Sequence, residues 1–247
     1  MLDSKCFSDA VDTQHFIRFR DDLLKDMHYH NFTLIKSSNS DDELFDIIEN
    51  EILLRKTQGM DFCNIVSFVP ISGPLAQRFT TKPEITVDGF YVFDNNKLPE
   101  LRIRKNCSIS SANNEAMMDD ILRLDLEHDK DSLGVDFCTR RVNRRKKVYL
   151  SSEGVTAYIC YDDNKAVGSC DLLIHKDTAK IEDFSVSPTK QRQGYGTTIL
   201  KFVIESALSC GASTIYLVAS EDDTAKEIYL KNGFNKIGQK TNLLFKF

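Results

Sequence analysis

The sequence predicts a mixed α/β protein, with one complete domain in its C-terminal part and an additional α/β region before it. Apolar runs of strand length alternate with segments in which apolar residues recur at helical spacing. From about residue 155 the order is strand, strand, strand, glycine-rich turn, helix, strand, helix, strand. This order is typical of a mixed sheet covered by helices. The length of 247 residues fits one to two domains, at roughly 150 residues each.

The N-terminal region is predicted to begin with a helix and a strand. Residues 40–43, Ser-Asp-Asp-Glu, have the form of a capping box, and the apolar residues after them recur at helical spacing. We expect this helix to end at Gly59, because glycine commonly terminates helices. The apolar run at 62–68 then indicates a buried strand.

A second strand and a domain boundary are expected further along this region. Residues 85–93 indicate a strand, which we expect to be split by the Asp-Gly pair at 88–89. Turn-forming residues gather at 94–104 and are typical of a boundary. The chain is therefore divided into an N-terminal α/β region of unknown role, residues 1–105, and a second domain, residues 107–247.

The second domain is predicted to open with two helices and three strands. The helices lie at 114–128 and 135–147, and the strands at 155–161, 166–174 and 179–186. Residues 162–165, Asp-Asp-Asn-Lys, are typical of a hairpin turn between the first two strands. A helix at 197–208 and a strand at 214–218 follow the glycine-rich turn.

The glycine-rich turn carries the most informative residues of the sequence. Gly194 and Gly196 lie where the chain turns from a strand into a helix and leaves backbone N–H groups uncovered. Such groups at a helix N-terminus form a cradle suited to a pyrophosphate, although glycines there can also serve packing alone. No Gly-Lys-Ser/Thr follows, which excludes a Walker A loop, and the third glycine of the dinucleotide fingerprint is replaced by Ile199.

Residues 107–247 resemble the GNAT superfamily of acyl-CoA-dependent N-acyltransferases. The family's pyrophosphate loop, Gln/Arg-x-x-Gly-x-Gly/Ala, is matched by Gln191, Gly194 and Gly196. Its fourth helix commonly has the pattern Ala-x-x-x-Tyr-x-x-x-Gly-Phe, which is matched by Ala225, Tyr229, Gly233 and Phe234. The strand at 181–186 also looks like the family's fourth strand, with acidic residues ahead of a valine.

The resemblance implies a GNAT-like fold that uses acetyl-CoA as co-substrate and no metal. In this family the loop binds the pyrophosphate, and the strand before it pairs with the pantetheine arm. The residues implied to bind acetyl-CoA are Phe184, Ser185, Val186, Gln191, Arg192, Gln193, Gly194, Tyr195, Gly196, Asp222 and Ala225. Arg192 either contacts phosphate or is solvated. Asp222 stands where the family often has Asn, and it can instead contribute to a helix cap.

The resemblance also implies an acid–base pair. Glu182 is the first candidate for the general base and Asp183 the second, each with a structural salt bridge as the alternative. Strand alternation places these two on opposite faces, so only one can face the cleft unless a bulge intervenes. Tyr229 is implied to be the general acid near the CoA sulfur, or else a core tyrosine.

The resemblance therefore implies an N-acetyltransferase that acts on a primary amine by direct attack. The alternative is a catalytically silent acyl-CoA-binding or protein-interaction module on the same fold. Residues 182–184, Glu-Asp-Phe, look like a run in spermidine/spermine acetyltransferases, and the net charge of −5 suits a cationic small-molecule or peptide acceptor. The sequence leaves the oligomeric state open, a homodimer included.

The composition of the chain argues against several other classes of protein. The charge of −5 argues against a protein built to coat nucleic acid or anionic lipid. No apolar run approaches the ~20 residues that cross a bilayer, and the first residues lack a signal-peptide pattern, so we expect a soluble cytoplasmic protein. The seven cysteines contain no CxxC pair and are expected to be reduced and mostly buried. His28 and His30 are more typical of solvated or hydrogen-bonded histidines than of metal ligands.

Two further patterns give hypotheses. Residues 140–147 hold six positive charges, which form either an anion-binding patch or, as we favour, a solvated helix face. The order helix, glycine, strand ending at 62–68 parallels helix, Gly211, strand at 214–218. Residues 13–93 are therefore interpreted as a degenerate or partial GNAT-like half that shapes the acceptor site, with unrelated α/β material as the alternative.

Overall fold

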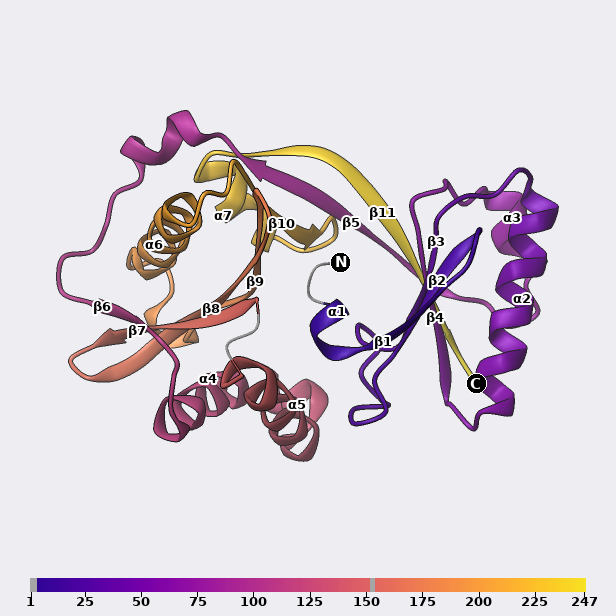
Figure 1. Cartoon of the computed structure of the whole chain (residues 1–247), viewed down its shortest axis with the longest axis horizontal. Helices are drawn as coiled ribbons and strands as arrows, with labels where there is room; N and C mark the ends of the chain where they lie inside the picture. Colours follow the sequence, from indigo (N-terminus) through magenta and orange to yellow (C-terminus); the bar gives the residue numbers. More distant parts are fainter. Residues whose placement is uncertain (1–3, 152–153) are drawn as a thin grey trace.

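The structure is a computed structural model that describes residues 4–151 and 154–247 (Figure 1). These residues form one sheet of eleven strands in the order β1-β2-β3-β4-β11-β5-β10-β9-β8-β7-β6. Figure 1 shows a lobe at each end, joined by the two long strands β5 (Glu84–Phe93) and β11 (Phe234–Lys246). No helix within the described residues has the length and apolar character needed to span a membrane.

The C-terminal lobe begins with a strand and two helices, continues with a three-strand meander, and ends with a helix, a strand and a helix. Its elements are β6 (Ser108–Ser111), α4 (Glu115–Leu133), α5 (Val135–Tyr149), β7 (Val155–Asp162), β8 (Lys165–His175), β9 (Thr178–Val186), α6 (Tyr195–Ser209), β10 (Thr214–Ser220) and α7 (Ala225–Lys231). Strands β7, β8 and β9 pair antiparallel, and β9 pairs parallel with β10. A short 3-10 helix, η2 (Pro188–Lys190), begins the connection from β9 to α6.

Helices cover both faces of this part of the sheet. Helix α6 packs its apolar side on Cys170, Leu172 and Ile181, which point to one face. Helices α4 and α5 pack on Val155 and Leu173, which point to the other face. Burial of apolar side chains on both faces is expected for strands in the centre of a mixed α/β sheet.

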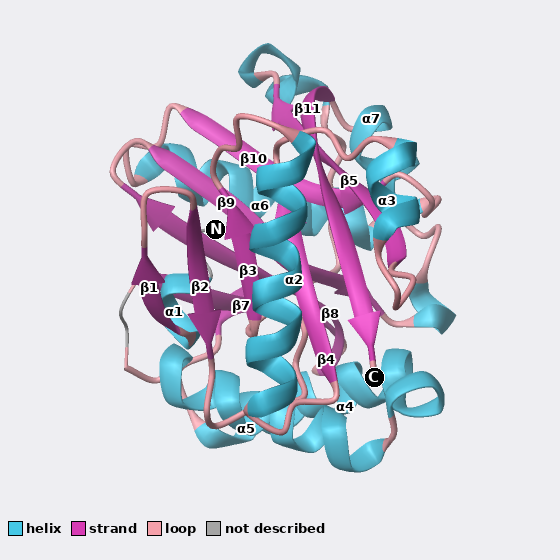
Figure 2. Ribbon diagram, turned by 90° about the vertical axis from the view of Figure 1, so that its right-hand side faces the viewer, coloured by secondary structure: helices cyan, strands magenta, loops and turns pink. Residues whose placement is uncertain are grey.

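The N-terminal lobe repeats the strand and helix order of the C-terminal lobe. Its elements are α1 (Ser4–Phe7), β1 (Asp9–Asp12), β2 (Phe16–Arg20), β3 (Phe32–Ile35), α2 (Asp41–Thr57), β4 (Phe62–Ser67), α3 (Gly73–Arg78) and β5. Strands β1, β2 and β3 pair antiparallel, and β3 pairs parallel with β4, as β7, β8, β9 and β10 do. Figure 2 shows α2 lying along the sheet on this side. The shared order confirms that residues 13–93 form a GNAT-like half, whereas its expected role in shaping the acceptor site stays a prediction.

The two lobes exchange their last strands. Strand β5 follows the first lobe in sequence but pairs with β10 of the second lobe, from Asp88↔Ser220 to Val92↔Tyr216. Strand β11 follows the second lobe but pairs with β4 of the first, and β5 and β11 pair with each other. The lobes therefore share one continuous sheet. The predicted boundary at 94–104 falls on a 3-10 helix, η1 (Asn95–Glu100), and the extended chain after it.

The predicted fold class and the predicted helices and strands of the second domain are confirmed, with ends shifted by a few residues. The hairpin turn at 163–164 has two residues with positive φ, Asp163 and Asn164, as a type I′ turn requires. The split of the second N-terminal strand is wrong, because β5 runs unbroken through Asp88 and Gly89. The Glu221 carboxylate and the Tyr91 ring fill the space where a side chain at Gly89 would lie.

The cysteine and histidine predictions agree with the structure. All seven cysteines are free thiols, and four of them are buried. His30 is buried, its Nδ1 lies 2.9 Å from Asp21 Oδ2, and its ring stacks on Phe7. The His28 ring packs on Phe62. Both histidines lie in the turn segment between β2 and β3.

Candidate functional site

Strands β9 and β10 separate partway along their length. Their parallel pairing runs from Thr178↔Thr214 to Ile181↔Leu217 and ends there. Beyond this point β9 continues on its β8 partner as far as Val186, while β10 continues on β5. The edge of β9 that faces β10 is thus opened over its last residues, and backbone groups there are placed to pair with an extended ligand.

A β-bulge at Asp183 reshapes the same part of β9. The register with β8 shifts between Asp171↔Glu182 and Ser169↔Ser185, so two residues of β9 lie opposite one of β8. Asp183 adopts a positive φ of 47°. A bulge changes the direction of the side chains at the kink. Strict strand alternation therefore no longer determines which of Glu182 and Asp183 faces the cleft.

The turn from β9 into α6 leaves a helix N-terminus without a side-chain cap. Gly194 precedes the helix with a φ of 90°, a conformation that favours glycine. Among the described residues no side chain caps the first turn of α6, and no acidic residue lies in it. The free N–H groups and the positive end of the helix dipole therefore form an anion-binding cradle.

Gly196 keeps this cradle open. A Cβ built on Gly196 would lie 3.1 Å from Ile228 Cδ1 and 3.2 Å from Phe184 Cζ. The two glycines of the loop thus serve different needs, since Gly194 provides a backbone conformation and Gly196 provides space.

One cavity of about 920 Å³ joins the cradle to the opened strand edge and to helices α4, α5 and α7. Most of the residues expected to bind acetyl-CoA or to act in catalysis line it. These are Asp183, Phe184, Ser185, Val186, Gln191, Arg192, Gly194, Gly196, Ala225 and Tyr229. The structure therefore brings together three motifs that lie up to 46 residues apart in the sequence, from Asp183 to Tyr229.

Four of the expected residues lie outside the lining of this cavity. Glu182 forms an ion pair with the buried Lys180. The side chain of Tyr195 is buried in the core and donates its hydroxyl to Asp162, so only its backbone belongs to the cradle. Gln193 donates its amide to the Thr189 carbonyl at 3.0 Å.

Asp222 is the fourth, and it contacts Ser220 only through its backbone N–H, at 3.2 Å. The expected cap in this segment is formed instead by Asp223, whose carboxylate accepts from the N–H of Ala225 at 2.9 Å. The N-cap position of α7 is occupied by Thr224, which lines the cavity.

Tyr229 lies on α7 with its ring in the core and one side on the cavity. The ring packs against Phe184 and Phe234, each with centroids 6.0 Å away. Burial is the main cause that raises the pKa of the Tyr229 hydroxyl, and Cys170 and Glu182 add to it. The phenol therefore keeps its proton at neutral pH. Tyr229 thus packs in the core and also lines the cavity, and its role as general acid stays a prediction.

Helices α4 and α5 supply a charged wall that the sequence analysis did not identify. Arg141 donates to Asp125 at 2.7 Å and also to Asp129. Arg145 pairs with Asp183 on the bulge and lies 3.8 Å from Asp125. The ion pairs thus form a chain from α4 across α5 to β9.

A buried carboxylate, Asp171 on β8, lies beside this chain and lines the cavity. It accepts a hydrogen bond from the Tyr149 hydroxyl of α5. Burial raises the pKa of Asp171 well above its ordinary value, and the neighbouring Asp183 carboxylate raises it further, whereas Arg145 lowers it. The sequence could have indicated this residue, because Asp171 is a single acidic residue inside an apolar strand. Acidic residues are seldom buried without a partner or a role.

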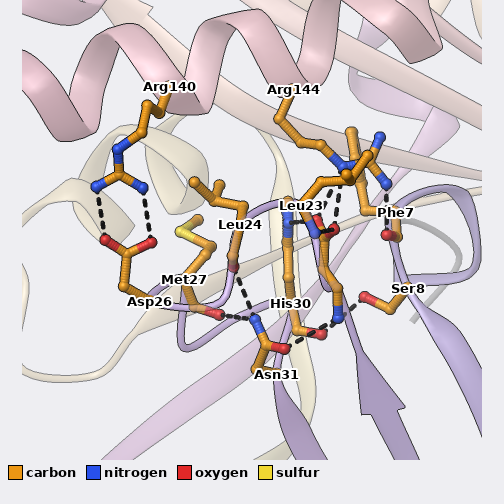
Figure 3. Close-up of polar contacts among 11 residues, drawn as sticks. Phe7, Ser8, Leu23, Leu24, Asp26, Met27, His30, Asn31, Arg140 and Arg144 are labelled. Carbon is orange, nitrogen blue, oxygen red and sulfur yellow. Dashed lines mark hydrogen bonds and ion pairs between the residues drawn. The ribbon is translucent and has the colours of Figure 1, made fainter. Parts of the chain in front are cut away.

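A second face of α5 contacts the N-terminal lobe (Figure 3). Arg140 forms two hydrogen bonds with Asp26, at 2.9 and 2.6 Å. Arg144 binds the buried Asp21 at 3.0 Å and donates to the Phe7 carbonyl at 2.6 Å. Because residues four apart share one helix face, Arg140 and Arg144 face this lobe.

The interpretation of residues 140–147 as a solvated helix face is therefore wrong. Arg140, Arg141, Arg144, Arg145 and Lys146 all form ion pairs with acidic residues of the same chain. The run is basic because α5 is surrounded by carboxylates from α4, from β9 and from the N-terminal lobe. Apart from Asp136, which pairs with Arg140 four residues later, these partners lie 12 or more positions away, which is why the run alone did not reveal them.

Comparison with known proteins agrees with this geometry. Residues 117–234 match the model of the Acetyltransferase (GNAT) family. The chain is 23% identical over 238 residues to the uncharacterized N-acetyltransferase CgeE of Bacillus subtilis, covering 93% of this chain and 89% of that protein.

Solved structures resemble the chain over nearly its whole length. A functionally unknown conserved protein from Staphylococcus epidermidis is similar with a TM-score of 0.82 at 19% identity, covering 97% of this chain and 94% of that one. A GCN5-related N-acetyltransferase from Kribbella flavida is similar with a TM-score of 0.70 at 12% identity, covering 98% and 91%. The two-lobed fold is thus shared by proteins with little sequence in common.

Proposed function

We propose, on the premise that residues 117–234 are a GNAT-family acetyltransferase domain, that the protein transfers an acetyl group from acetyl-CoA to a primary amine. The observation that carries this proposal is the single cavity that joins the uncapped N-terminus of α6, the opened edge of β9 and the Asp183–Tyr229 pair. An anion cradle, a groove for an extended arm and a pair of proton-transferring groups are the parts that such a reaction needs.

The residues fit acetyl-CoA. The backbone N–H groups from Gln191 to Gly196 would hold the pyrophosphate, with Arg192 beside them. The backbone of Phe184, Ser185 and Val186 would pair with the amides of the pantetheine arm. Bound acetyl-CoA supplies the acetyl group as a thioester, whose carbonyl carbon forms a bond to the acceptor nitrogen as the bond to sulfur breaks.

We assign the general base to Asp183 in preference to Glu182. Asp183 lines the cavity, whereas Glu182 lies outside its lining and is paired with Lys180. A base must lie within hydrogen-bond reach of the proton that it removes, directly or through one water. Asp183 takes a proton from the acceptor nitrogen, and Arg145 orients its carboxylate.

Tyr229 is the general acid. Its hydroxyl keeps its proton at neutral pH because burial raises its pKa. It lies on α7 and lines the same cavity as Asp183. Tyr229 donates this proton to the departing sulfur, so that the thiol leaves in neutral form.

The test is release of free thiol from acetyl-CoA in the presence of a panel of amines. We expect Asp183→Asn to lower kcat about a hundredfold and Tyr229→Phe to lower it about tenfold, with acetyl-CoA binding retained. Asparagine suits the positive φ at position 183, so this variant keeps the bulge. Glu182→Gln is the control and should keep most of the activity. Acetyl-CoA binding without turnover on any amine would instead favour the silent binding module.

A further inference from the structure

The part of the cavity lined by α4, α5, β8 and the bulge holds more acidic than basic side chains. Its charged lining from α4, α5, β8 and the bulge consists of Asp125, Asp129, Asp171 and Asp183 against Arg141 and Arg145. These four carboxyl groups outnumber the two guanidinium groups. In an environment of low dielectric such an excess favours a cationic ligand.

Three buried polar atoms in this wall lack partners among the described residues. They are Asp125 Oδ2, His128 Nε2 and Arg141 Nε, and all three residues line the cavity. Asp125 and Arg141 each expose a tenth or less of their side chains. A buried polar atom without a hydrogen bond is unfavourable, and these three belong to residues that line the cavity, where a bound ligand can supply the partner. Two of the three, the carboxylate oxygen and the imidazole nitrogen, can accept from an ammonium group.

In the proposed reaction, the amino group that is acetylated contacts Asp183 and not Asp125, His128 or Arg141. Asp183, assigned above as the base, meets Arg145 from the bulge side, and Asp125 approaches the same guanidinium from α4. Two acidic positions therefore lie on either side of Arg145. Asp125, Asp129 and His128 line the same cavity as Asp183, so a single acceptor can contact both places.

We propose that the acceptor is a diamine, with one amino group at Asp183 and a second, non-reacting ammonium group bound by Asp125 and Asp129. This inference rests on the proposed acetyl transfer and adds the substrate class to it. Asp125 and Asp129 are binding residues in this proposal, and His128 completes the ammonium site with its free Nε2.

The test compares acceptors that differ only in their distal group. Putrescine and cadaverine are each measured against the amino alcohol, the alkylamine and the ω-amino acid of matching chain length, by thiol release from acetyl-CoA. We expect the diamines to have a kcat/KM at least about tenfold higher than the amino alcohols, because the hydroxyl of an amino alcohol cannot form a charge-assisted ion pair with the two carboxylates. Equal or better use of an amino alcohol or an ω-amino acid would overturn the proposal.

Variants on α4 locate the second site. Asp129→Asn, at a partly exposed position, should remove most of the diamine preference, measured as the ratio of kcat/KM for putrescine to kcat/KM for the matching alkylamine. Asp125→Asn should do the same, and Asp129→Asn keeps the test valid if Asp125→Asn does not fold. The control is Asp131→Asn, an exposed position of the same helix that loses the same charge. A diamine preference that survives Asp129→Asn contradicts the proposal.

Direct binding separates this inference from the proposed reaction. Putrescine is titrated calorimetrically into the wild type and Asp129→Asn, each saturated with CoA. If no amine is acetylated but putrescine binds the wild type at least about tenfold more tightly than the variant, the proposed reaction fails and the diamine site stands. If transfer occurs and putrescine binds both proteins equally, the reaction stands and the diamine site fails.

Discussion

In the N-terminal lobe the connection from β3 to α2 ends on Ser40, whereas in the C-terminal lobe the connection from β9 to α6 ends on Gly194. Ser40 Oγ accepts from the Glu43 N–H at 3.2 Å, and the first turn of α2 holds three acidic residues. This helix N-terminus is satisfied by its own side chains and repels anions. The N-terminus of α6 has neither feature and is open to an anionic ligand.

The strands beside these two helices differ in the same direction. Strands β3 and β4 pair along the whole of β3, from Phe32↔Asn64 to Ile35↔Ser67, so no edge is opened between them. Strands β9 and β10 part after Ile181↔Leu217. The same strand–helix–strand topology therefore gives a structural lobe in one case and a candidate active site in the other. The local loop, cap and strand separation make the difference.

The strongest test of this difference is to fill the cradle. Gly196→Leu places a side chain where Ile228 and Phe184 already lie, and we expect acetyl-CoA affinity to fall at least about a hundredfold in calorimetric titrations. Gly73→Leu in α3 of the other lobe is the control, because nothing lies within 4 Å of its Cβ position. Equal loss of binding in both variants would mean that the cradle is not the binding site.

The contact between the lobes can be broken on α5. Arg144→Ala leaves Asp21 buried without its guanidinium, and we expect the free energy of unfolding to fall by about 2–4 kcal/mol in urea. Arg140→Ala removes an exposed pair with Asp26 and should cost less than about 1 kcal/mol. A similar cost for both variants would show that burial of Asp21 does not matter.

The same contact predicts a dependence on pH. Burial alone raises the pKa of Asp21, but its hydrogen bond with His30 and the charge of Arg144 outweigh this, so the pKa is lowered overall. A carboxylate with a lowered pKa stabilises the fold above its unfolded pKa of about 3.9. This stabilisation is lost as the pH falls through the folded pKa. Acid unfolding should therefore begin at higher pH in Arg144→Ala than in the wild type.

A smaller effect is expected when α6 is made to resemble α2. Thr197→Glu places a carboxylate in the first turn of α6, where it competes with a bound pyrophosphate. We expect acetyl-CoA to bind about tenfold more weakly, with the difference shrinking at high salt. Thr197→Gln has a similar shape and no charge, and it serves as the control. A loss that is equal in the two variants would be steric.

The smallest effect is expected in the lobe without the site. Ser40→Ala removes the cap of α2 and should lower the free energy of unfolding by about 1 kcal/mol. Acetyl-CoA affinity should not change, because the N-terminus of α2 does not line the cavity. A measurable change in that affinity would mean that the lobes are coupled more closely than their separate helix termini indicate.

Local signals in the sequence were sufficient for much of the fold. Capping residues, apolar spacing and glycines located α2, β4, α6 and the hairpin between β7 and β8, since each depends on residues that are neighbours in the chain. The short strands β1, β2 and β3 were not predicted, because four or five residues are too few to show a period. The exchange of β5 and β11 left no local signal at all.

The candidate site likewise has one part that local sequence patterns predict and another part that they do not. The loop from Gln191 to Gly196 and the helix with Tyr229 have family patterns that are contiguous, and the structure brings both to the cavity. The wall formed by Asp125 and Arg141 depends on how two helices pack. The helical periodicity of the sequence marks these positions only as a polar face. Which of these residues pair depends on the tertiary structure.

The strand exchange also bears on how the chain reaches its native state. Strand β4 acquires its antiparallel neighbour only when β11 arrives, and Phe62 then pairs with Lys246, 184 positions later in the sequence. Contacts of such long range slow folding, and an unpaired strand edge is prone to associate with other chains. During synthesis one edge of β4 would therefore stay unpaired until the second lobe, which includes β11, is complete. We therefore expect refolding to end in one slow step in which β5 and β11 close the sheet together, and aggregation to compete with that step.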